Sequence, residues 1–427
     1  MRDTWLGPTF CNTLPLPVPV SARILSSSFS SSSSMAASSS HHRFHHHRRC
    51  YSNPNPPHPQ PALLVFSGGT AFNGVIEELK NYTNRVAHIL PVSDDGGSTA
   101  EIVRVLGGPA VGDIRSRCLR LSDQSTVEAL AVRNLLGHRL PLDPSQAKSE
   151  WYSIVEGDHF LWKDVSKPYR ETIRAFLVYF QSQILHRAEE SFCFSNGSIG
   201  NFFFAGARIF FQSLDAAIFL FSRVSDIPPE SLVLPVISTN DRLTLGCELW
   251  DGTIIRGQNE ISHPTRGTIE LIKKGSFSTP ALPSRIKRVF YMSSEGKNLL
   301  HEVFPSVNAA VLEWLNNVDC IVYGMGSLFT SICPSLVLLG IGEIISSRSC
   351  LKPNHYINTL LVPRNGEIPV DTDSLAAQGI FDVILVDSIR DPKVGIIYDP
   401  SSLIRSLADL TDRYMKSQVN DLIDTRR

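Results

Sequence analysis

The chain has 427 residues, 42% hydrophobic and 19% charged, so it has enough apolar material for a large buried core and enough length for two or three folding units. Its formal net charge of -1 at pH 7 produces no overall electrostatic field of either sign. The composition therefore gives no reason to expect binding to nucleic acid or to a charged membrane surface. The most apolar run, residues 199–221, is interrupted by Arg208 and Asp215, so we expect a soluble protein.

Residues 1–61 differ in composition from the rest of the chain. They contain one acidic residue, Asp3, together with a serine run from Ser26 to Ser34 and a tract rich in histidine and arginine from His41 to Arg49. This acid-poor, Ser- and Arg-rich composition is typical of organelle transit peptides. We therefore expect residues 1–61 to be a disordered leader that directs the protein to the chloroplast, with the mitochondrion or the cytoplasm as alternatives. A second transit-like segment opens at Met35, so translation could start at either Met1 or Met35.

The folded part is predicted to begin with a buried strand and a glycine-rich turn. Residues Ala62 to Phe66 are continuously apolar, as in a strand buried on both faces of a parallel sheet, and the turn Ser67-Gly68-Gly69-Thr70 follows directly. Glycines let the backbone approach a phosphate group closely, and the free amides at the start of a following helix complete an anion site. A purely structural tight turn is the alternative interpretation.

A second apolar run, Val86 to Val92, follows at the spacing of a βαβ unit and ends in the polar segment from Ser93 to Ser98. The polar residues of both turns therefore follow adjacent strands, at the edge where doubly wound sheets bind their ligands.

Carboxylates in and after this second turn are candidates for holding a metal ion. Asp94 and Asp95 lie in the turn, and Asp113 lies in the segment Gly112-Asp113-Ile114-Arg115. Such hard oxygen ligands suit Mg²⁺ bridging phosphate oxygens, with Arg115 neutralising developing charge. The alternative is that these aspartates cap helices that start near residues 98 and 114.

Residues 125–224 are predicted to form a mostly helical insertion over the sheet. Apolar residues recur at helical spacing in Ser125 to Leu136, Lys167 to His186 and Gly200 to Phe211. The polar segment from Ser195 to Asn201 precedes the last of these helices and is either a turn that faces a ligand or the ordinary start of a helix.

Strand signals return after residue 225. The expected elements are strands at Val233 to Ile237 and Arg288 to Met292, a hairpin around Trp250 to Thr253, a helix at Val307 to Leu315, strands at Asp319 to Tyr323, Ile357 to Val362 and Phe381 to Val386, and a final helix at Ser401 to Leu410. This order predicts the α/β class, with a Rossmann-like, doubly wound and mostly parallel sheet built from residues 62–124 and 225–427.

A second glycine- and hydroxyl-rich turn, Gly324 to Ser331, follows the strand that ends at Tyr323. Two such turns in one sheet favour nucleotide binding over two structural turns. Neither turn matches the Walker lysine pattern or the full GxGxxG pattern, so an ATPase and a standard dehydrogenase are not supported.

Five motifs in this order, SGGT after a strand, SDDGGS, GDIR with LSD, NGSIGN and GMGSLFTSICP, resemble the 2-phospho-L-lactate transferase (CofD) and YvcK family, and plant CofD-like members in particular. The resemblance covers residues 62–410 and implies a Rossmann-like core with a helical insertion and a tendency to form homodimers. One branch of the family transfers a 2-phospholactyl group from a guanosine diphosphate adduct to a hydroxyl of a deazaflavin, releasing GMP and using Mg²⁺. The other, YvcK-like branch, the gluconeogenesis factors, binds UDP-sugars and regulates carbon metabolism, and the SDDGGS and GDIR motifs look more like this branch.

The resemblance predicts a nucleotide-binding transferase of the 2-phospho-L-lactate transferase type, with a non-catalytic regulator that binds nucleotide sugars as the alternative. Its ligand would be a GDP- or UDP-type nucleotide. Asp113 and Arg115 are the expected catalytic residues, and Asp94, Asp95 and Asp113 the expected Mg²⁺ ligands. The residues expected to contact the nucleotide are Gly68, Gly69, Thr70, Asn73, Asn196, Gly324, Gly326, Ser327, Thr330 and Ser331.

The chain departs from the family pattern near Ser349 to Pro353, where the family has a further strand. A parallel sheet that lacks an interior strand exposes strand edges. We hypothesise that a segment is missing here through alternative splicing or an error in the gene model.

Overall fold

The computed structural model describes residues 60–93, 96–187, 191–264, 282–293, 301–348, 356–392 and 395–424. Residues 57–427 form one unit of the chain. The predicted leader up to residue 59, Asp94 and Asp95 lie outside the described residues, and the expectations about localisation and start position therefore stay predictions.

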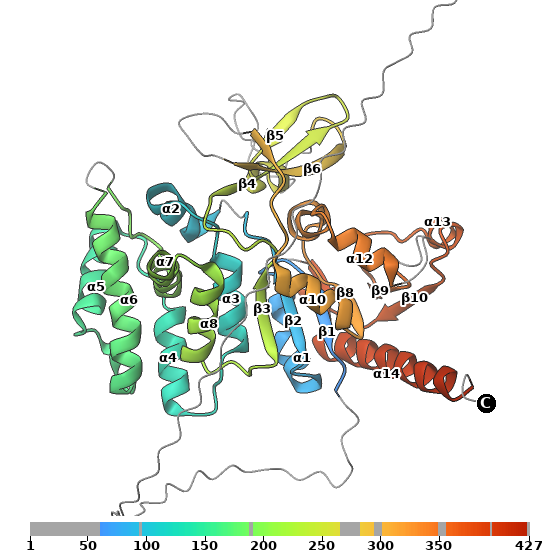
Figure 1. Cartoon of the computed structure of the whole chain (residues 1–427), viewed down its shortest axis with the longest axis horizontal. Helices are drawn as coiled ribbons and strands as arrows, with labels where there is room; N and C mark the ends of the chain where they lie inside the picture. Colours follow the sequence, from blue (N-terminus) through green and yellow to red (C-terminus); the bar gives the residue numbers. More distant parts are fainter. Residues whose placement is uncertain are drawn as a thin grey trace, which may run out of the picture. The chain divides into compact units, whose positions relative to one another are not determined.

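A parallel four-stranded sheet in the order β3-β2-β1-β8 stands at the centre of the fold (Figure 1). Its strands are β1 (Leu63–Phe66), β2 (Val86–Leu90), β3 (Ser231–Pro235) and β8 (Cys320–Tyr323). Every residue of β1 and β2 is buried, and since successive side chains point to opposite faces, both faces of the sheet are covered at its centre. The predicted α/β fold with a mostly parallel sheet is confirmed.

The strand β1 is the point at which the order of the sheet reverses. The chain runs from β1 outward through β2 to β3 and then returns to place β8 on the other side of β1, so that Leu63 pairs with Val86 and with Cys320. In open α/β sheets, ligands bind outside the carboxyl ends of the strands at such a switch point. Both predicted glycine turns follow the two strands that meet there.

Helices cover the sheet. The short helix η1 (Phe72–Val75) and α1 (Ile76–Tyr82) follow the first turn, and α1 contacts α3 (Gly112–Leu121) and the long C-terminal helix α14 (Pro400–Asp424). The Tyr82 and Thr411 hydroxyls are hydrogen-bonded and join α1 to α14. Helix α10 (Ala309–Asn317) contacts β2 and α12 (Ile341–Ser347).

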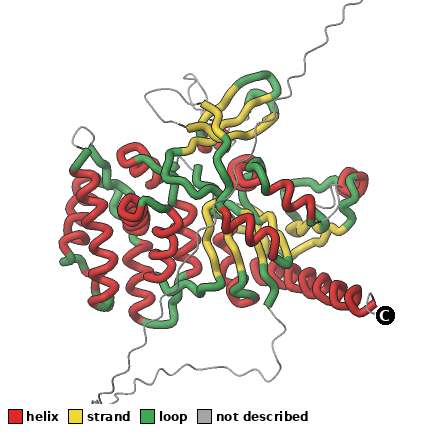
Figure 2. The backbone as a smooth tube through the Cα atoms, in the orientation of Figure 1, coloured by secondary structure: helices red, strands yellow, loops and turns green. Residues whose placement is uncertain are grey.

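A large helical segment separates β2 from β3 along the chain, and its helices are among those drawn in red in Figure 2. After α2 (Gly97–Leu106) and α3 it contains α4 (Val127–Gly137), α5 (Pro144–Glu156), η2 (Phe160–Trp162), α6 (Lys167–Leu185), α7 (Ile199–Phe211) and α8 (Leu214–Val224). Side-chain caps fix where helices begin, because Thr126 accepts a hydrogen bond from the Ala129 amide and Asp143 accepts one from the Gln146 amide.

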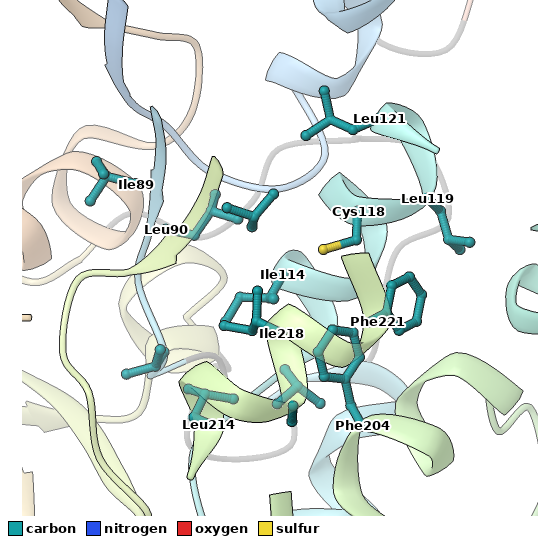
Figure 3. Close-up of a cluster of buried hydrophobic side chains, with 14 of the residues drawn as sticks. Ile89, Leu90, Ile114, Cys118, Leu119, Leu121, Phe204, Leu214, Ile218 and Phe221 are labelled. Carbon is teal, nitrogen blue, oxygen red and sulfur yellow. The ribbon is translucent and has the colours of Figure 1, made fainter. Parts of the chain in front are cut away.

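The helical segment shares its core with the sheet. Figure 3 shows Ile89 and Leu90 of β2 in one cluster with Ile114 and Cys118 of α3 and with side chains of α7 and α8. Phe204 and Phe221 stack there with ring centroids 4.5 Å apart. The position of α3 is therefore fixed by packing from both sides.

A second, antiparallel sheet has the order β5-β4-β6-β7. It contains β4 (Leu243–Leu249), β5 (Ile254–Arg256), β6 (Ile286–Ser293) and β7 (His301–Val303), with α9 (Gln258–Ser262) after β5. The hairpin expected around residues 250–253 is present as β4 and β5, and Gly252 in its turn has a φ of 86°. Sequence analysis assigned these residues to the Rossmann-like core, whereas they form a sheet of their own.

The last strands also pair apart from the central sheet. Within the described ranges, β9 (Thr359–Pro363) pairs in parallel with β10 (Asp382–Val386), and β11 (Ser388–Asp391) pairs with β12 (Gly395–Tyr398), with α13 (Thr372–Ala377) between β9 and β10. In the same ranges β1 is the one partner of β8. The join at residues 349–355, where a strand was expected to be missing, lies outside the described residues.

Across the part of the chain that the structure describes, no single helix has both the length and the apolar composition of a membrane span. The helical segments Leu328–Leu336 and Ile341–Ser347 have the required length and apolar composition only when they are taken together, and the angle between them is 78°.

Candidate functional site

The two glycine turns touch each other at the carboxyl ends of β1 and β8. A Cβ atom built at Gly68 would lie 2.6 Å from Oγ of Ser331, and one built at Gly326 would lie 3.1 Å from the backbone nitrogen of Gly68. Gly326 also has a φ of 155°, which residues with a side chain rarely adopt. A side chain at Gly68 would therefore displace Ser331, and one at Gly326 would press on both Ser331 and the backbone of Gly68.

The second turn leads directly into a short π-helix, η3 (Leu328–Ile332). The amide of Gly324 donates to the carbonyl of Phe66 at 2.8 Å, which continues the pairing of β1 with β8, and the amide of Ser331 donates to the carbonyl of Ser327 at 2.8 Å. Ser327 is exposed, whereas Thr330 is buried. Thr70 of the first turn is also exposed, and Ser331 of the second turn is half-buried.

Asp113 reaches across from α3 to the first turn. Its Oδ2 accepts a hydrogen bond from the Gly69 amide at 3.1 Å, and a Cβ atom at Gly69 would overlap the Asp113 carboxylate. The N-cap of α3 is Val111, so Asp113 is not the capping residue that we considered as the alternative. The structure thus brings Asp113 together with Gly68, Gly69 and Ser331.

Arg117 holds the first turn from behind and was missed by sequence analysis. Its guanidinium is buried, donates to the Gly68 carbonyl at 2.9 Å and to Ser67 Oγ at 3.2 Å, and stands 5.0 Å from the centroid of the Phe72 ring. Burial lowers its pKa to about 10, against the opposing effect of Asp113, so it stays charged at neutral pH. Arg117 lies one helical turn after Asp113 in α3, and this spacing is the signal that could have identified it.

His88 in β2 is the third member of this buried network. Arg117 Nη1 lies 3.0 Å from His88 Nδ1, and since a guanidinium can only donate, Nδ1 accepts and the neutral ring carries its proton on Nε2. Complete burial, reinforced by the charge of Arg117, lowers the pKa of His88 well below 6.5.

Asn73 has both of its polar side-chain atoms engaged. Its Oδ1 accepts from Arg117 Nε at 2.9 Å, and its Nδ2 donates to Ser116 Oγ at 2.9 Å. Asn73 was expected to contact the nucleotide, but in the structure its amide joins η1 to α3 beneath the first turn.

Arg115 and Asn196 belong to the contact between α3 and the helical segment. Arg115 Nε donates to Asn201 Oδ1 at 3.2 Å, and burial, followed by the charge of Arg139, lowers the pKa of Arg115 to about 10. Asn196 has a φ of 55°, and its carbonyl accepts from Arg139 Nη1 at 2.9 Å. Its backbone amide donates to the Pro141 carbonyl at 2.9 Å, so within the described residues the backbone of Asn196 bonds to the segment after α4.

The expected Mg²⁺ site includes one described carboxylate, that of Asp113. Its oxygens have the hard-donor chemistry that Mg²⁺ prefers, and they lie against the first turn. Asp94 and Asp95 are outside the described residues, and within these residues no group of three or more His, Cys, Asp or Glu side chains could hold a metal ion. Magnesium binding stays a prediction.

Comparison with known proteins agrees with the motif pattern. Residues 63–407 match the model of the family described as 2-phospho-L-lactate transferase CofD. A protein of Saccharomyces cerevisiae described as uncharacterized is 34% identical, and the match covers 70% of this chain and 77% of the yeast protein. The gluconeogenesis factor of Halalkalibacterium halodurans is 27% identical over 77% of this chain and 76% of its own length. The crystal structure of a UPF0052 family member from Bacillus halodurans shares the fold, with a TM-score of 0.54 and 21% identity over 81% of this chain and 99% of that chain. The chain belongs to the 2-phospho-L-lactate transferase CofD family.

Proposed function

We propose that this protein binds the diphosphate group of a nucleotide or nucleotide sugar between its two glycine turns. The observation that carries the proposal is the approach of Gly68 to Ser331 and Gly326 at the switch point of the sheet. Gly68 and Gly326 have no side chains and lie against Ser331 there, and the exposed residues Thr70 and Ser327 belong to the same two turns. Such turns favour phosphate binding because glycine lets the backbone come close to the phosphate oxygens.

We further propose that the site transfers a phosphorus-containing group to a hydroxyl acceptor. The acceptor oxygen would attack the phosphorus of the phospholactyl group, the bond from that phosphorus to the nucleoside monophosphate oxygen would break, and the hydroxyl proton would pass to the Asp113 carboxylate. Arg115 and Arg117 are the nearby cations that would offset charge on the phosphate oxygens. Asp113, together with Asp94 and Asp95, would hold Mg²⁺, which when bound neutralises phosphate charge.

A regulator that binds without turnover is the second candidate. Relatives named gluconeogenesis factor, at 27% identity in Halalkalibacterium halodurans and 25% in Bacillus subtilis, favour it. In this case the turns would hold a UDP-sugar, and Asp113 would act only by fixing the Gly69 amide.

A ligand panel followed by a turnover assay tests both candidates. The melting temperature of the full chain is measured with UDP-sugars, GDP, GTP and NAD, with and without Mg²⁺, because a ligand at about 100 times its Kd stabilises the native state by about 2.7 kcal/mol. Ligands that stabilise are then incubated with a hydroxyl acceptor, and release of the nucleoside monophosphate is followed.

Asp113→Asn separates the transferase from the regulator. The amide still accepts from Gly69 but cannot take up a proton, so turnover should fall at least about 100-fold while nucleotide affinity measured without Mg²⁺ changes little. Asp158→Asn, at an exposed position in the helical segment, is the matched control and should change neither. If no nucleotide shifts the melting temperature, both candidates are wrong.

A further inference from the structure

We infer that the nucleobase of the bound nucleotide occupies a cavity of about 520 Å³ between the antiparallel sheet and η3. This inference rests on the proposed function, since it concerns the base of the nucleotide whose phosphates would lie at the glycine turns. The volume falls within the roughly 300–1,000 Å³ of small-molecule sites.

Aromatic side chains on two separate elements line the cavity. Trp250 stands in the hairpin turn after β4 and is 69% exposed, and Phe329 stands in η3 and is 38% exposed. Ile261, which is buried, and Ile286 add apolar surface. A tryptophan this exposed in the lining of a cavity offers a flat face on which a planar ring can stack.

The cavity and the second glycine turn share a residue. Ser327 lines the cavity and is also the N-cap of η3, within the turn Gly324 to Ser331. In a nucleotide the ribose joins the base to the phosphates. A base in this cavity would therefore place its ribose near Ser327 and its phosphates along the turn.

Hydrogen bonds fix the backbone of the cavity walls. The Trp250 amide donates to the Arg285 carbonyl at 3.0 Å, which ties the hairpin to the start of β6. The buried Tyr291 hydroxyl donates to the Pro334 carbonyl at 2.8 Å and so attaches β6 to α11 (Cys333–Leu336), which follows η3. Helix α9 contacts η3 as well. The walls are thus held in place before a ligand arrives.

Polar groups in the lining suit the edge of a base. Arg285 is exposed. Among the described residues, its guanidinium takes part in no hydrogen bond or ion pair. A guanidinium donates to the carbonyl oxygens that uracil and guanine both carry.

A second cavity, of about 540 Å³, is lined largely by charged and amide side chains, among them Lys80, Arg120 and Arg133, and has no aromatic wall.

Trp250→Ala and Trp250→Phe in the full chain test the inference, with UDP, GDP and inorganic pyrophosphate as probes in calorimetric titrations. Stacking of a base on an aromatic ring is worth about 1–3 kcal/mol, so Trp250→Ala should weaken binding of the nucleotide by about 5- to 150-fold, while Trp250→Phe should keep most of the affinity. Pyrophosphate has no base, and its affinity should stay within about twofold in both variants. Phe304→Ala, which removes an aromatic ring that is 79% exposed and does not line this cavity, should leave all affinities unchanged.

The outcomes separate this inference from the proposed function. Nucleotide affinity that is unchanged in Trp250→Ala, or reduced equally for pyrophosphate and nucleotide, would overturn the base site and leave the phosphate site standing. Failure of the unsubstituted protein to bind any of the probes would overturn the proposed function and the inference with it. A preference for UDP or for GDP in the unsubstituted protein, lost in Trp250→Ala, would support the inference and identify the base.

Discussion

The guanidinium of Arg117 and the imidazole of His88 meet in the core at 3.0 Å, with the arginine as donor. This contact joins α3 to the middle of β2, and the same guanidinium holds the carbonyl of Gly68. The conformation of the first glycine turn therefore depends on a charge buried beneath it. Because the Gly68 carbonyl points inward to Arg117, a ligand would meet the other side of the turn.

Loss of the Arg117 guanidinium should destabilise the whole fold. Arg117→Met keeps much of the volume but leaves acceptors of His88, Asn73 and Gly68 buried without a donor. Unsatisfied buried groups cost about 1–3 kcal/mol each, and we expect the free energy of unfolding to fall by about 3 kcal/mol in urea denaturation. Arg120→Met, at an exposed position in the same helix, is the control and should change it by less than about 0.5 kcal/mol. Equal stability of the two variants would contradict the role given to Arg117.

Acid should destabilise the protein through His88. Its pKa in the folded protein is well below 6.5, so below pH 6.5 the unfolded chain binds a proton that the folded protein does not. The contribution of His88 to stability is therefore complete above pH 6.5, and it decreases as the pH falls, by up to about 1.4 kcal/mol per pH unit, until the folded pKa is reached.

Urea denaturation between pH 7.5 and 5 measures this effect. In His88→Gln the amide can accept from Arg117 and does not titrate, so the stability curve should be flatter below pH 6.5 than that of the unsubstituted protein. His263→Gln, which changes an exposed histidine, should keep the original slope. If the slope in His88→Gln is also unchanged, another group carries the pH dependence.

Gly69→Ala should disrupt the site, whereas Gly74→Ala should not. A Cβ atom at Gly69 would overlap the Asp113 carboxylate, while one at Gly74 in η1 would meet nothing within 4 Å. Forcing the carboxylate aside costs about 1–3 kcal/mol and breaks its hydrogen bond to the turn. We expect at least about tenfold weaker nucleotide binding in Gly69→Ala and unchanged binding in Gly74→Ala, measured by calorimetry. Equal affinities would mean that the turn tolerates a side chain and does not approach a ligand closely.

A longer form of this chain should carry an additional strand between α12 and β9. In the described residues β8 pairs only with β1 and β9 only with β10, although the residues of both β8 and β9 are half-buried. One more parallel strand would satisfy the open edge of β8. Sequencing of transcripts across codons 345–356 tests this, and if no longer form is found, the separate sheets are this protein's own architecture.

The elements that sequence analysis located best are those with a strong local pattern. Continuous apolar runs predicted β1, β2 and β8 to within two residues at each end, and helical periodicity predicted α6 and α7 almost to the residue. The final helix was expected to end at Leu410 but continues to Asp424, and Met415, Val419 and Leu422 repeat at the i, i+4, i+7 spacing of a helix in the part that was missed.

Long-range contacts were harder to anticipate. From its local sequence Asp113 could be a helix cap or a site residue, and the two are distinguished only in the fold, where Val111 is the N-cap of α3 and Asp113 accepts from the Gly69 amide. Arg117 has the sequence environment of an exposed helical arginine, and its burial follows from packing between η1, β2 and the first turn. Trp250 was predicted as part of a hairpin turn, but its place in a cavity depends on η3, which comes much later in the chain.

The pairing of β1 with β8 has a consequence for biosynthesis. Ala62 and Asp319, which flank these strands, are hydrogen-bonded although they are 257 positions apart in the chain. At a synthesis rate of about 5–20 residues per second, β1 would remain without this neighbour for on the order of ten seconds or more after it leaves the ribosome. During that interval one edge of an entirely apolar strand is open and half of the candidate phosphate site does not yet exist. The candidate phosphate site can therefore form only after synthesis has passed Ser331, at about three quarters of the 427-residue chain.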